Sequence, residues 1–403
     1  MKNKICKPGI ILLSFICLTF LTGCWDYTEI EKRGYVLGMA IDLAEAKDLK
    51  DQFKDAKPES GIPIYSYTIQ IPLIPKSSIK PLGQGGGGGG GASESKTWNL
   101  RMAGNSLFEA NRELSTILDY PPFYEHLKVI VISEEASREG IYGPLDFLLR
   151  DPEMRRRTKV FITPKKAYQA LEVTPKIEDY PSMYLRSLPN NYVRNSRIVH
   201  RIDLGRISES LHGGNDFILP KIIVGSREIK DAGAAVFKKD KMVGWIDEIQ
   251  LNYLKWITGY AEGGTLTIDS PDNPNKQVSL EMKSLKTNVK PVINGDEITF
   301  NINTKAAFNI AEINYEHNKA AFNKDFIKEI EVIAERKAEN EMRKTIESVQ
   351  NEYGADTFFF YRVMQRYAPD TWDKVKDDWH SIFPKVKVNI NVSIKIKEVG
   401  LIK

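Results

Sequence analysis

The stretch VSLEMKSLKTNVKPVI at residues 278–293 runs into Asn294-Gly295-Asp296 and then into EITFNINTKAAFNIAEI at residues 297–313. Both long segments predict β-strands, and an Asn-Gly turn between two such segments is a strong signal for a β-hairpin. We therefore expect an antiparallel strand pair that organises the C-terminal part of the chain.

A long helix and a last strand are expected to complete this C-terminal unit. Apolar residues recur every three to five positions from about Lys324 to Tyr353, and Gly354 marks the helix end. From Val386 to Ile396, six Val or Ile residues alternate with polar residues, which predicts a half-buried antiparallel strand. The unit is thus predicted to be α+β, with an antiparallel sheet and a long helix.

The first half of the chain alternates between predicted strands and helices. Residues 65–71 alternate between apolar or aromatic and polar side chains, which is typical of a strand. Ser106 and Glu109 have the spacing of a capping box and predict a helix through Leu118, and residues 126–133 predict a buried strand. This order of elements favours a mixed α/β sheet.

Seven consecutive glycines occupy residues 85–91. They contain a formal GxGxxG match, but a phosphate-binding loop needs a strand before it and a helix after it. The backbone entropy of a glycine homopolymer opposes any single conformation. We therefore expect a disordered loop over residues 83–95 and no cofactor site there.

The N-terminus has the pattern of a lipoprotein signal peptide. Three lysines precede an apolar run of about a dozen residues, which is shorter than the roughly 20 residues that a transmembrane helix needs. A plain secretory signal and an uncleaved membrane anchor are the alternatives. However, Leu21-Thr22-Gly23-Cys24 matches the bacterial lipobox, in which the signal is cut before the cysteine. Cys24 is therefore the predicted lipid-anchor residue, with diacylglycerol on its sulfur and palmitate on its amino group.

We predict an α+β fold class, with three consecutive mixed α/β domains after the removed signal peptide at residues 1–23. The N-terminal domain is expected at residues 24–195, the middle domain at 196–275 and the C-terminal domain at 276–403. Within the middle domain, residues 239–241 predict a hairpin turn.

Few residues of the mature chain suggest chemistry. Cleavage would remove Cys6 and Cys17, so Cys24 would be the remaining thiol, without a disulfide framework or a thiol metal cluster. The histidines are scattered, and no two have the spacing of a zinc-binding helix; they are His126, His200, His212, His317 and His380. We expect no catalytic residue, no metal site and no cofactor.

An acidic cluster near the C-terminus is open to two interpretations. Asp373, Asp377 and Asp378 lie beside Trp372 and Trp379 on a predicted helix. A carboxylate pair for acid and base catalysis is one interpretation, and a solvated helix face is the other.

Charge excludes one class of partner. The full chain carries a formal charge of +4, and removal of the three signal-peptide lysines leaves it nearly neutral. Nucleic-acid binders carry a strong basic excess, so we expect no nucleic-acid partner.

Residues 186–206 hold five arginines against Asp203 alone. This basic run could face anionic headgroups or an acidic partner, or it could be a solvated surface.

Several motifs together resemble one family. They are GCWDYTEIEKRGYVLGMAID at 23–42, HLKVIVISEEASREGI at 126–141, LDFLLRDPEMR at 145–155, AAVFKKDKMVGWID at 234–247, and the final segment from PDTWDKVKDDWHSIF onward at 369–403. This combination, in this order, resembles the Ger(x)C family, the lipoprotein C subunits of germinant receptors in endospore-forming bacteria. Two departures are the glycine tract and Phe358-Phe359-Phe360, where the family more often carries glycine. A buried aromatic cluster is expected there.

The resemblance implies a fold of three α+β domains and a function without catalysis. It implies a subunit that is lipid-anchored on the outer face of the inner spore membrane, beside an A subunit and a transporter-like B subunit, in a complex that senses amino acids or sugars. The alternative is an independent solute-binding lipoprotein with a deep cleft between two matched lobes, for which the sequence shows no matched halves. Small-molecule binding by this chain itself is left open.

Overall fold

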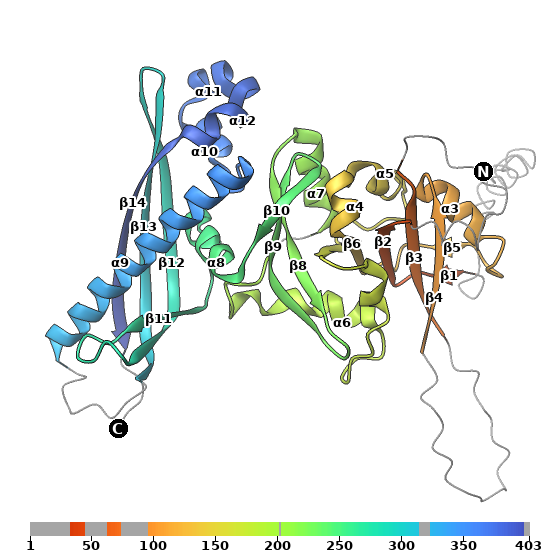
Figure 1. Cartoon of the computed structure of the whole chain (residues 1–403), viewed down its shortest axis with the longest axis horizontal. Coiled ribbons are helices and arrows are strands. Elements are labelled where there is room, and N and C mark those ends of the chain that lie inside the picture. The colour runs from red at the N-terminus through yellow and green to blue at the C-terminus, as the bar shows by residue number, and fades with distance from the viewer. Residues whose placement is uncertain (1–32, 45–62, 74–95, 201–202, 314–322, 399–403) are drawn as a thin grey trace, which may run out of the picture.

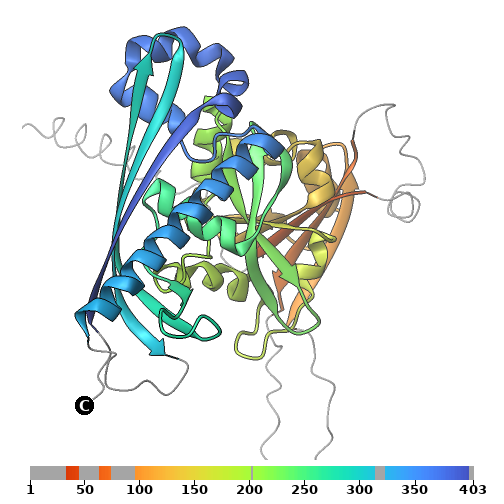
Figure 2. The same ribbon diagram turned by 60° about the vertical axis from the view of Figure 1, so that its left-hand side comes forward.

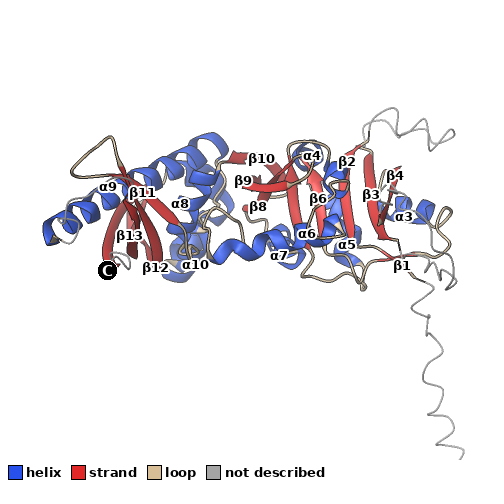
Figure 3. Cartoon of the chain, turned by 90° about the horizontal axis from the view of Figure 1, so that it is seen from below, coloured by secondary structure: helices blue, strands red, loops and turns tan. Residues whose placement is uncertain are grey.

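The computed structural model describes residues 33–44, 63–73, 96–200, 203–313 and 323–398. The predicted signal peptide, Cys24 and the glycine loop at 83–95 lie outside the described residues. The chain forms two main sheets toward opposite ends of an elongated molecule (Figure 1). Figure 3 shows helix α8 (Glu248–Thr258) between them.

The larger sheet has eight strands in the order β10-β9-β8-β7-β6-β2-β3-β4. The strands β2, β6 and β7 run parallel, and β3 and β4 add antiparallel strands at one edge. The bounds are β2 (Gly38–Leu43), β3 (Tyr65–Pro72), β4 (Thr97–Gly104), β6 (Val129–Ser133), β7 (Lys159–Thr163), β8 (Phe217–Val224), β9 (Ile229–Lys238) and β10 (Lys241–Ile246). A small pair, β1 (Gly34–Tyr35) and β5 (Pro122–Phe123), lies beside this sheet.

Both faces of the larger sheet are buried. In β6, Val129 and Val131 belong to one hydrophobic core, whereas Ile130 and Ile132 belong to the other. A strand covered on both sides needs a continuous apolar run, as VIVIS supplies. The covering elements are α3 (Leu107–Leu114), α4 (Glu134–Glu139), α5 (Tyr142–Arg150), the 3₁₀ helix Ala167–Leu171, α6 (Pro181–Ser187), the 3₁₀ helix Leu188–Val193 and α7 (Leu204–Gly213).

The capping box predicted for α3 forms only in part. The Ser106 side chain accepts a hydrogen bond from the Glu109 N–H, as expected. The Glu109 carboxylate accepts from the Asn105 N–H. The helix ends at Leu114, so the predicted end at Leu118 is wrong. After Leu114 the chain forms turns and bends that lead to β5.

The middle segment contributes strands to both sheets. β8 joins β7 through the register pair of Ile162 and Lys221, and β9 and β10 follow through the predicted hairpin turn. Strand β11 (Thr265–Asp269) instead pairs with β12 of the smaller sheet. The division into three domains with boundaries near residues 195 and 275 therefore stays a proposal.

The smaller sheet has the order β11-β12-β13-β14. The strands β12 (Gln277–Asn294) and β13 (Glu297–Ile313) form the predicted hairpin, and Gly295 adopts the positive φ of 60° that its turn requires. Helix α9 (Lys324–Ser348) continues through a π turn at Val349–Tyr353 and stops at Gly354, as predicted. Figure 2 shows α9 lying along this sheet.

The last strand runs in the opposite direction to the one we predicted. β14 (Lys387–Glu398) pairs with β13 in parallel, so the C-terminal sheet is mixed and not wholly antiparallel. The reason is the crossover through α9, α10 (Phe360–Tyr367), α11 (Pro369–Val375) and α12 (Trp379–Ile382), which returns the chain to the start of the sheet. Alternation of apolar and polar residues indicates that one face of a strand is buried. It does not indicate whether the strand runs parallel or antiparallel to its neighbour.

Three glutamates of α9 cover the free edge of β14. The carboxylates of Glu331, Glu335 and Glu339 accept hydrogen bonds of 2.9 Å from the N–H groups of Ile396, Ile394 and Val392, in that order. The glutamates are four residues apart on the helix, a rise of about 6 Å, and their donors are two residues apart on the strand, a rise of about 6.6 Å. The two spacings therefore match along the edge of the strand. This ladder satisfies edge N–H groups that could otherwise pair with another chain.

The ladder predicts that Glu335→Ala lowers the free energy of unfolding by about 1–3 kcal/mol, because the Ile394 N–H loses a charged acceptor. Urea denaturation followed by circular dichroism measures the loss. Glu329→Ala, at an exposed position of the same helix, is the matched control and should change stability by less than about 0.5 kcal/mol. Equal effects of the two substitutions would contradict the ladder.

Candidate functional site: a pocket at the junction of the two sheets

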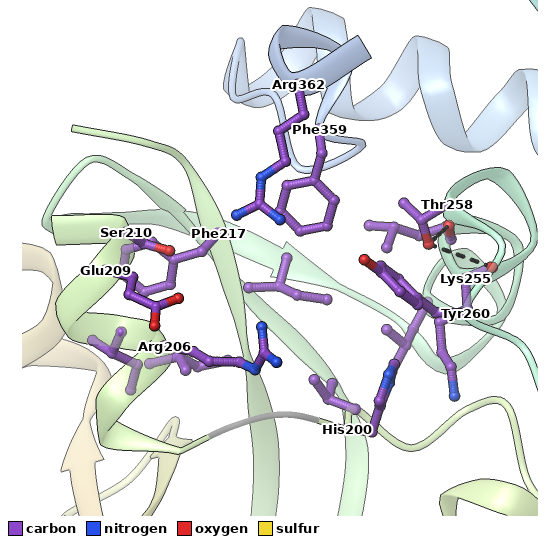
Figure 4. Close-up of a pocket in the computed structure, with 16 residues that line it drawn as sticks. His200, Arg206, Glu209, Ser210, Phe217, Lys255, Thr258, Tyr260, Phe359 and Arg362 are labelled. Atoms are coloured by element: carbon purple, nitrogen blue, oxygen red, sulfur yellow. Dashed lines mark hydrogen bonds between the residues drawn. The ribbon is translucent and has the colours of Figure 1, made fainter. Parts of the chain in front are cut away.

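A cavity of about 110 Å³ lies where α7, β8, α8 and α10 meet (Figure 4). The first three elements come from the larger sheet and its flank, whereas α10 belongs to the C-terminal part of the chain. The pocket is therefore built from segments more than 140 residues apart in sequence, of which α7 and α10 carry charged side chains into it.

The floor of the pocket is apolar and buried. Phe217 and Leu219 come from β8, and Leu251 and Leu254 come from α8; all four side chains are buried. The Phe217 ring stacks on Phe237 with centroids 4.9 Å apart and planes at 3°. This stacking fixes the part of the floor that a ligand would contact.

Two guanidinium groups enter the cavity from opposite walls. Arg206 extends from α7 and Arg362 from α10, and Figure 4 shows both heads directed into the space between them. Within the described residues, neither group forms an ion pair with a carboxylate. Arg362 donates to the Tyr361 hydroxyl at 2.8 Å and lies 4.9 Å from the Phe359 ring centroid. Glu209, one turn along α7 from Arg206, also lines the cavity.

Lys255 lines the pocket with the aliphatic part of its side chain and not with its ammonium group. Its side chain is 3% exposed, and the ammonium donates to the Ile198 carbonyl at 3.1 Å. Burial lowers the pKa of Lys255, and burial likewise raises the pKa of the nearby Asp231 carboxyl, because both charged forms lose hydration. The attraction between the two groups opposes these shifts, but burial is the larger effect for both.

Aromatic rings form another wall. His200 stacks on Tyr192 with planes at 13° and centroids 5.2 Å apart, and its other neighbour is Tyr260 at 5.3 Å. Tyr260 lines the cavity, and its hydroxyl points inward in Figure 4. His200 thus acts as a packed ring of the wall.

Phe359 occupies a strained backbone position at the pocket mouth. Its φ of 60° is a left-handed conformation that bulky residues rarely adopt. The neighbouring Phe358 and Phe360 are buried, and Phe360 stacks on Phe300 with centroids 4.3 Å apart. The aromatic cluster expected at these three residues is confirmed for Phe358 and Phe360, whereas Phe359 is half-buried and faces the cavity.

A buried carboxylate holds this segment in place. Asp356 accepts hydrogen bonds from the N–H groups of Phe360 and Tyr361 and from the Trp379 indole. It thereby binds the first turn of α10, where the helix dipole favours negative charge. Both Phe359 and Arg362 are positioned through this contact.

A second carboxylate ties that turn to the larger sheet. Asp216, 3% exposed and directly before β8, accepts from the Asp356 N–H at 2.8 Å and from the Lys239 N–H at 3.0 Å. The His380 ring nitrogen Nε2 lies 3.0 Å from the same carboxylate. Asp216 therefore joins the β9–β10 turn, the α10 turn and α12.

The basic run and the acidic cluster of the sequence do not meet at one site. Of the basic run, Arg206 reaches the pocket, whereas Arg197 lies 3.9 Å from Glu248, and Arg201 lies outside the described residues. Asp373, Asp377 and Asp378 are exposed, so the solvated-face interpretation holds for them.

The other histidines do not form a cluster. His126 packs against Tyr35 with ring centroids 5.1 Å apart, and its pKa is lowered mainly by burial. His212 bonds the Ser208 carbonyl at the end of α7, and His317 lies outside the described residues. Among the described residues no group of three or more His, Cys, Asp and Glu side chains could hold a metal ion.

Sequence reasoning missed Asp216, Asp356 and Arg362. Asp216 and Asp356 are 140 residues apart and carry no local motif, and Arg362 is one of several charges on its helix. The positive φ at Phe359 also has no sequence signal, because an aromatic residue disfavours it. The only pointer was the unusual run of three phenylalanines.

Two family descriptions match almost the whole chain. Residues 26–224 match "Spore germination protein N-terminal domain", and residues 232–400 match "Spore germination B3/ GerAC like, C-terminal". The chain is 28% identical to spore germination protein YndF of Bacillus subtilis (strain 168), across 100% of both chains. It is 26% identical to spore germination protein B3 of the same organism, across 96% of this chain and 97% of that one.

The crystal structure of the GerBC protein has the same fold. It superposes with a TM-score of 0.57 at 23% identity and covers 85% of this chain and 96% of its own. The α+β architecture described above is therefore that of a class of spore germination proteins. The chain belongs to the Ger(x)C family, as its motifs indicated.

Burial raises the pKa of Asp356 from its ordinary value of 3.8 to about 6, against the opposing effect of its three hydrogen bonds. Between about pH 4 and 6 the folded state thus holds a proton that the unfolded state releases, so the free energy of unfolding falls as pH rises. The fall attributable to Asp356 is roughly 3 kcal/mol, at about 1.4 kcal/mol per pKa unit.

Asp356→Asn should remove this slope, and urea denaturation at several pH values measures it as the difference between wild type and variant. Asp377→Asn, the same substitution at an exposed position, should leave the slope unchanged. Parallel curves for wild type and Asp356→Asn would show that Asp356 does not titrate in this window.

Proposed function

We propose that this protein is the lipid-anchored C subunit of a nutrient germinant receptor complex, acting in spore germination by protein–protein interaction and without catalysis. The observation that carries the proposal is the match to spore germination proteins over the full chain, beginning two residues after the lipobox cysteine.

The anchor would be Cys24. Arg33, the first described residue, is nine positions further along the chain, and nine steps of extended chain span at most about 30 Å. The described chain begins at β1, which pairs with β5 beside the larger sheet. This sheet would therefore be held close to the lipid surface, while the smaller sheet extends away along the long axis of the molecule (Figure 1).

Acyl chains, and not a spanning helix, would keep the protein on the outer face of the inner spore membrane. Each buried methylene contributes about 0.8 kcal/mol, and two or more chains give stable anchoring where one gives marginal binding. In the described part of the chain, every helix is too short or too polar to cross a bilayer.

The proposed partners are the A and B membrane subunits of the receptor. No nucleic-acid partner is proposed, because the mature chain is nearly neutral. An independent solute-binding lipoprotein would need two matched lobes around a deep cleft. The two sheets differ in strand number and order, so they do not form two matched lobes.

Cys24→Ala should move the protein from the spore membrane fraction to the soluble fraction or cause its loss, and it should slow nutrient-triggered germination. Immunoblotting of fractions and the fall in spore absorbance after nutrient addition measure the two effects. Cys17→Ala, the same substitution within the predicted signal peptide, is the matched control and should behave as wild type. Membrane retention with a normal nutrient response in Cys24→Ala would contradict the proposal.

A further inference from the structure

We propose that the pocket at the sheet junction binds a small organic monocarboxylate, with its carboxylate between Arg206 and Arg362 and its apolar part on Phe217 and Leu219. This inference concerns a site on the chain itself and does not depend on the lipid anchor or on partner subunits.

The two arginines supply the anion recognition. They come from different parts of the fold and point into one cavity, and within the described residues no carboxylate forms an ion pair with either. Two positive charges directed into one cavity repel each other, and an anion between them relieves that repulsion. A guanidinium group binds a carboxylate through paired N–H donors, which suits a carboxylate bridging both.

The apolar floor and the aromatic walls of the cavity would contact the part of the ligand that carries no charge. The buried floor at Phe217 and Leu219 offers apolar contact, and Tyr260 and Phe359 add aromatic faces. A volume of about 110 Å³ is well below the range of roughly 300–1,000 Å³ typical of larger ligands. A short branched chain or a single ring is therefore of a size that fits this cavity.

Glu209 limits the charge of the ligand. Its carboxylate lies on the same helix as Arg206 and lines the same cavity. A second negative charge on the ligand would meet this carboxylate, which disfavours dianions such as phosphate. The site thus selects monoanions with an apolar body.

Binding would also link the two halves of the molecule. Arg206 is fixed to the larger sheet through α7, whereas Arg362 is fixed through α10, whose first turn is bound by Asp356. A ligand held by both arginines would stabilise the junction, so its affinity depends on the two halves keeping this geometry.

Isothermal titration of the purified mature chain tests the proposal, with benzoate and isovalerate as the probes. Benzamide, which has the ring without the charge, and inorganic phosphate, which has the charge without the apolar body, are the ligand controls. We expect saturable binding of at least one carboxylate probe and at least tenfold weaker binding of benzamide and phosphate. Equal binding of either control would overturn the proposal, as would the absence of binding by both probes.

Arg206→Gln and Arg362→Gln should each weaken carboxylate binding by about tenfold or more, because each removes one charged pair. Both side chains are exposed, so the variants should keep the circular dichroism spectrum and melting temperature of wild type. Arg366→Gln, one turn further along α10 and outside the cavity, is the matched control and should bind within about twofold of wild type. Unchanged affinity in both pocket variants would overturn the site.

Discussion

The contact between Asp216 and the turn at Asp356 determines how the part of the protein around the larger sheet meets the C-terminal part around the smaller sheet. One carboxylate before β8 accepts from the Asp356 backbone, and the Asp356 carboxylate then binds the first turn of α10. Both carboxylates are almost completely buried. Buried charged groups are tolerated only when hydrogen bonds replace their lost hydration, and a partner removed from such a network leaves a costly unpaired group. The contact therefore orders the strained Phe359 and the Arg362 side chain at the pocket.

The rest of the junction is consistent with a firm connection. One hydrophobic core runs from a face of the larger sheet through α8 into the smaller sheet. Around it, the Tyr353 hydroxyl donates to the Trp245 carbonyl at 2.7 Å, and the Thr287 hydroxyl donates to the Trp256 carbonyl at 2.6 Å. A pocket whose walls come from both halves needs such a junction, because its charged groups keep their spacing only if the halves do not separate.

Local patterns in the sequence predicted local structure well. The β12–β13 hairpin, the turn at residues 239–241 and the end at Gly354 of the π turn that continues α9 all follow from turn and stop signals within a few residues. The direction of β14 and the pairing of β11 with the smaller sheet depend on how distant segments dock. The pocket also depends on how distant segments dock, so the sequence predicts it only in part. The basic run at residues 186–206 includes Arg206, but nothing near Arg362 in the sequence indicates that α10 lies opposite α7.

We propose above all that this protein works as one subunit of a membrane complex. The most direct measurement is purification of the full-length, tagged protein from detergent-solubilised spore membranes, followed by mass spectrometry of the proteins recovered with it. The account predicts comparable recovery of two integral membrane proteins, one of them transporter-like, which are absent when the tag is on an unrelated spore lipoprotein. Recovery of this protein alone, at the same solubilisation efficiency, would contradict it.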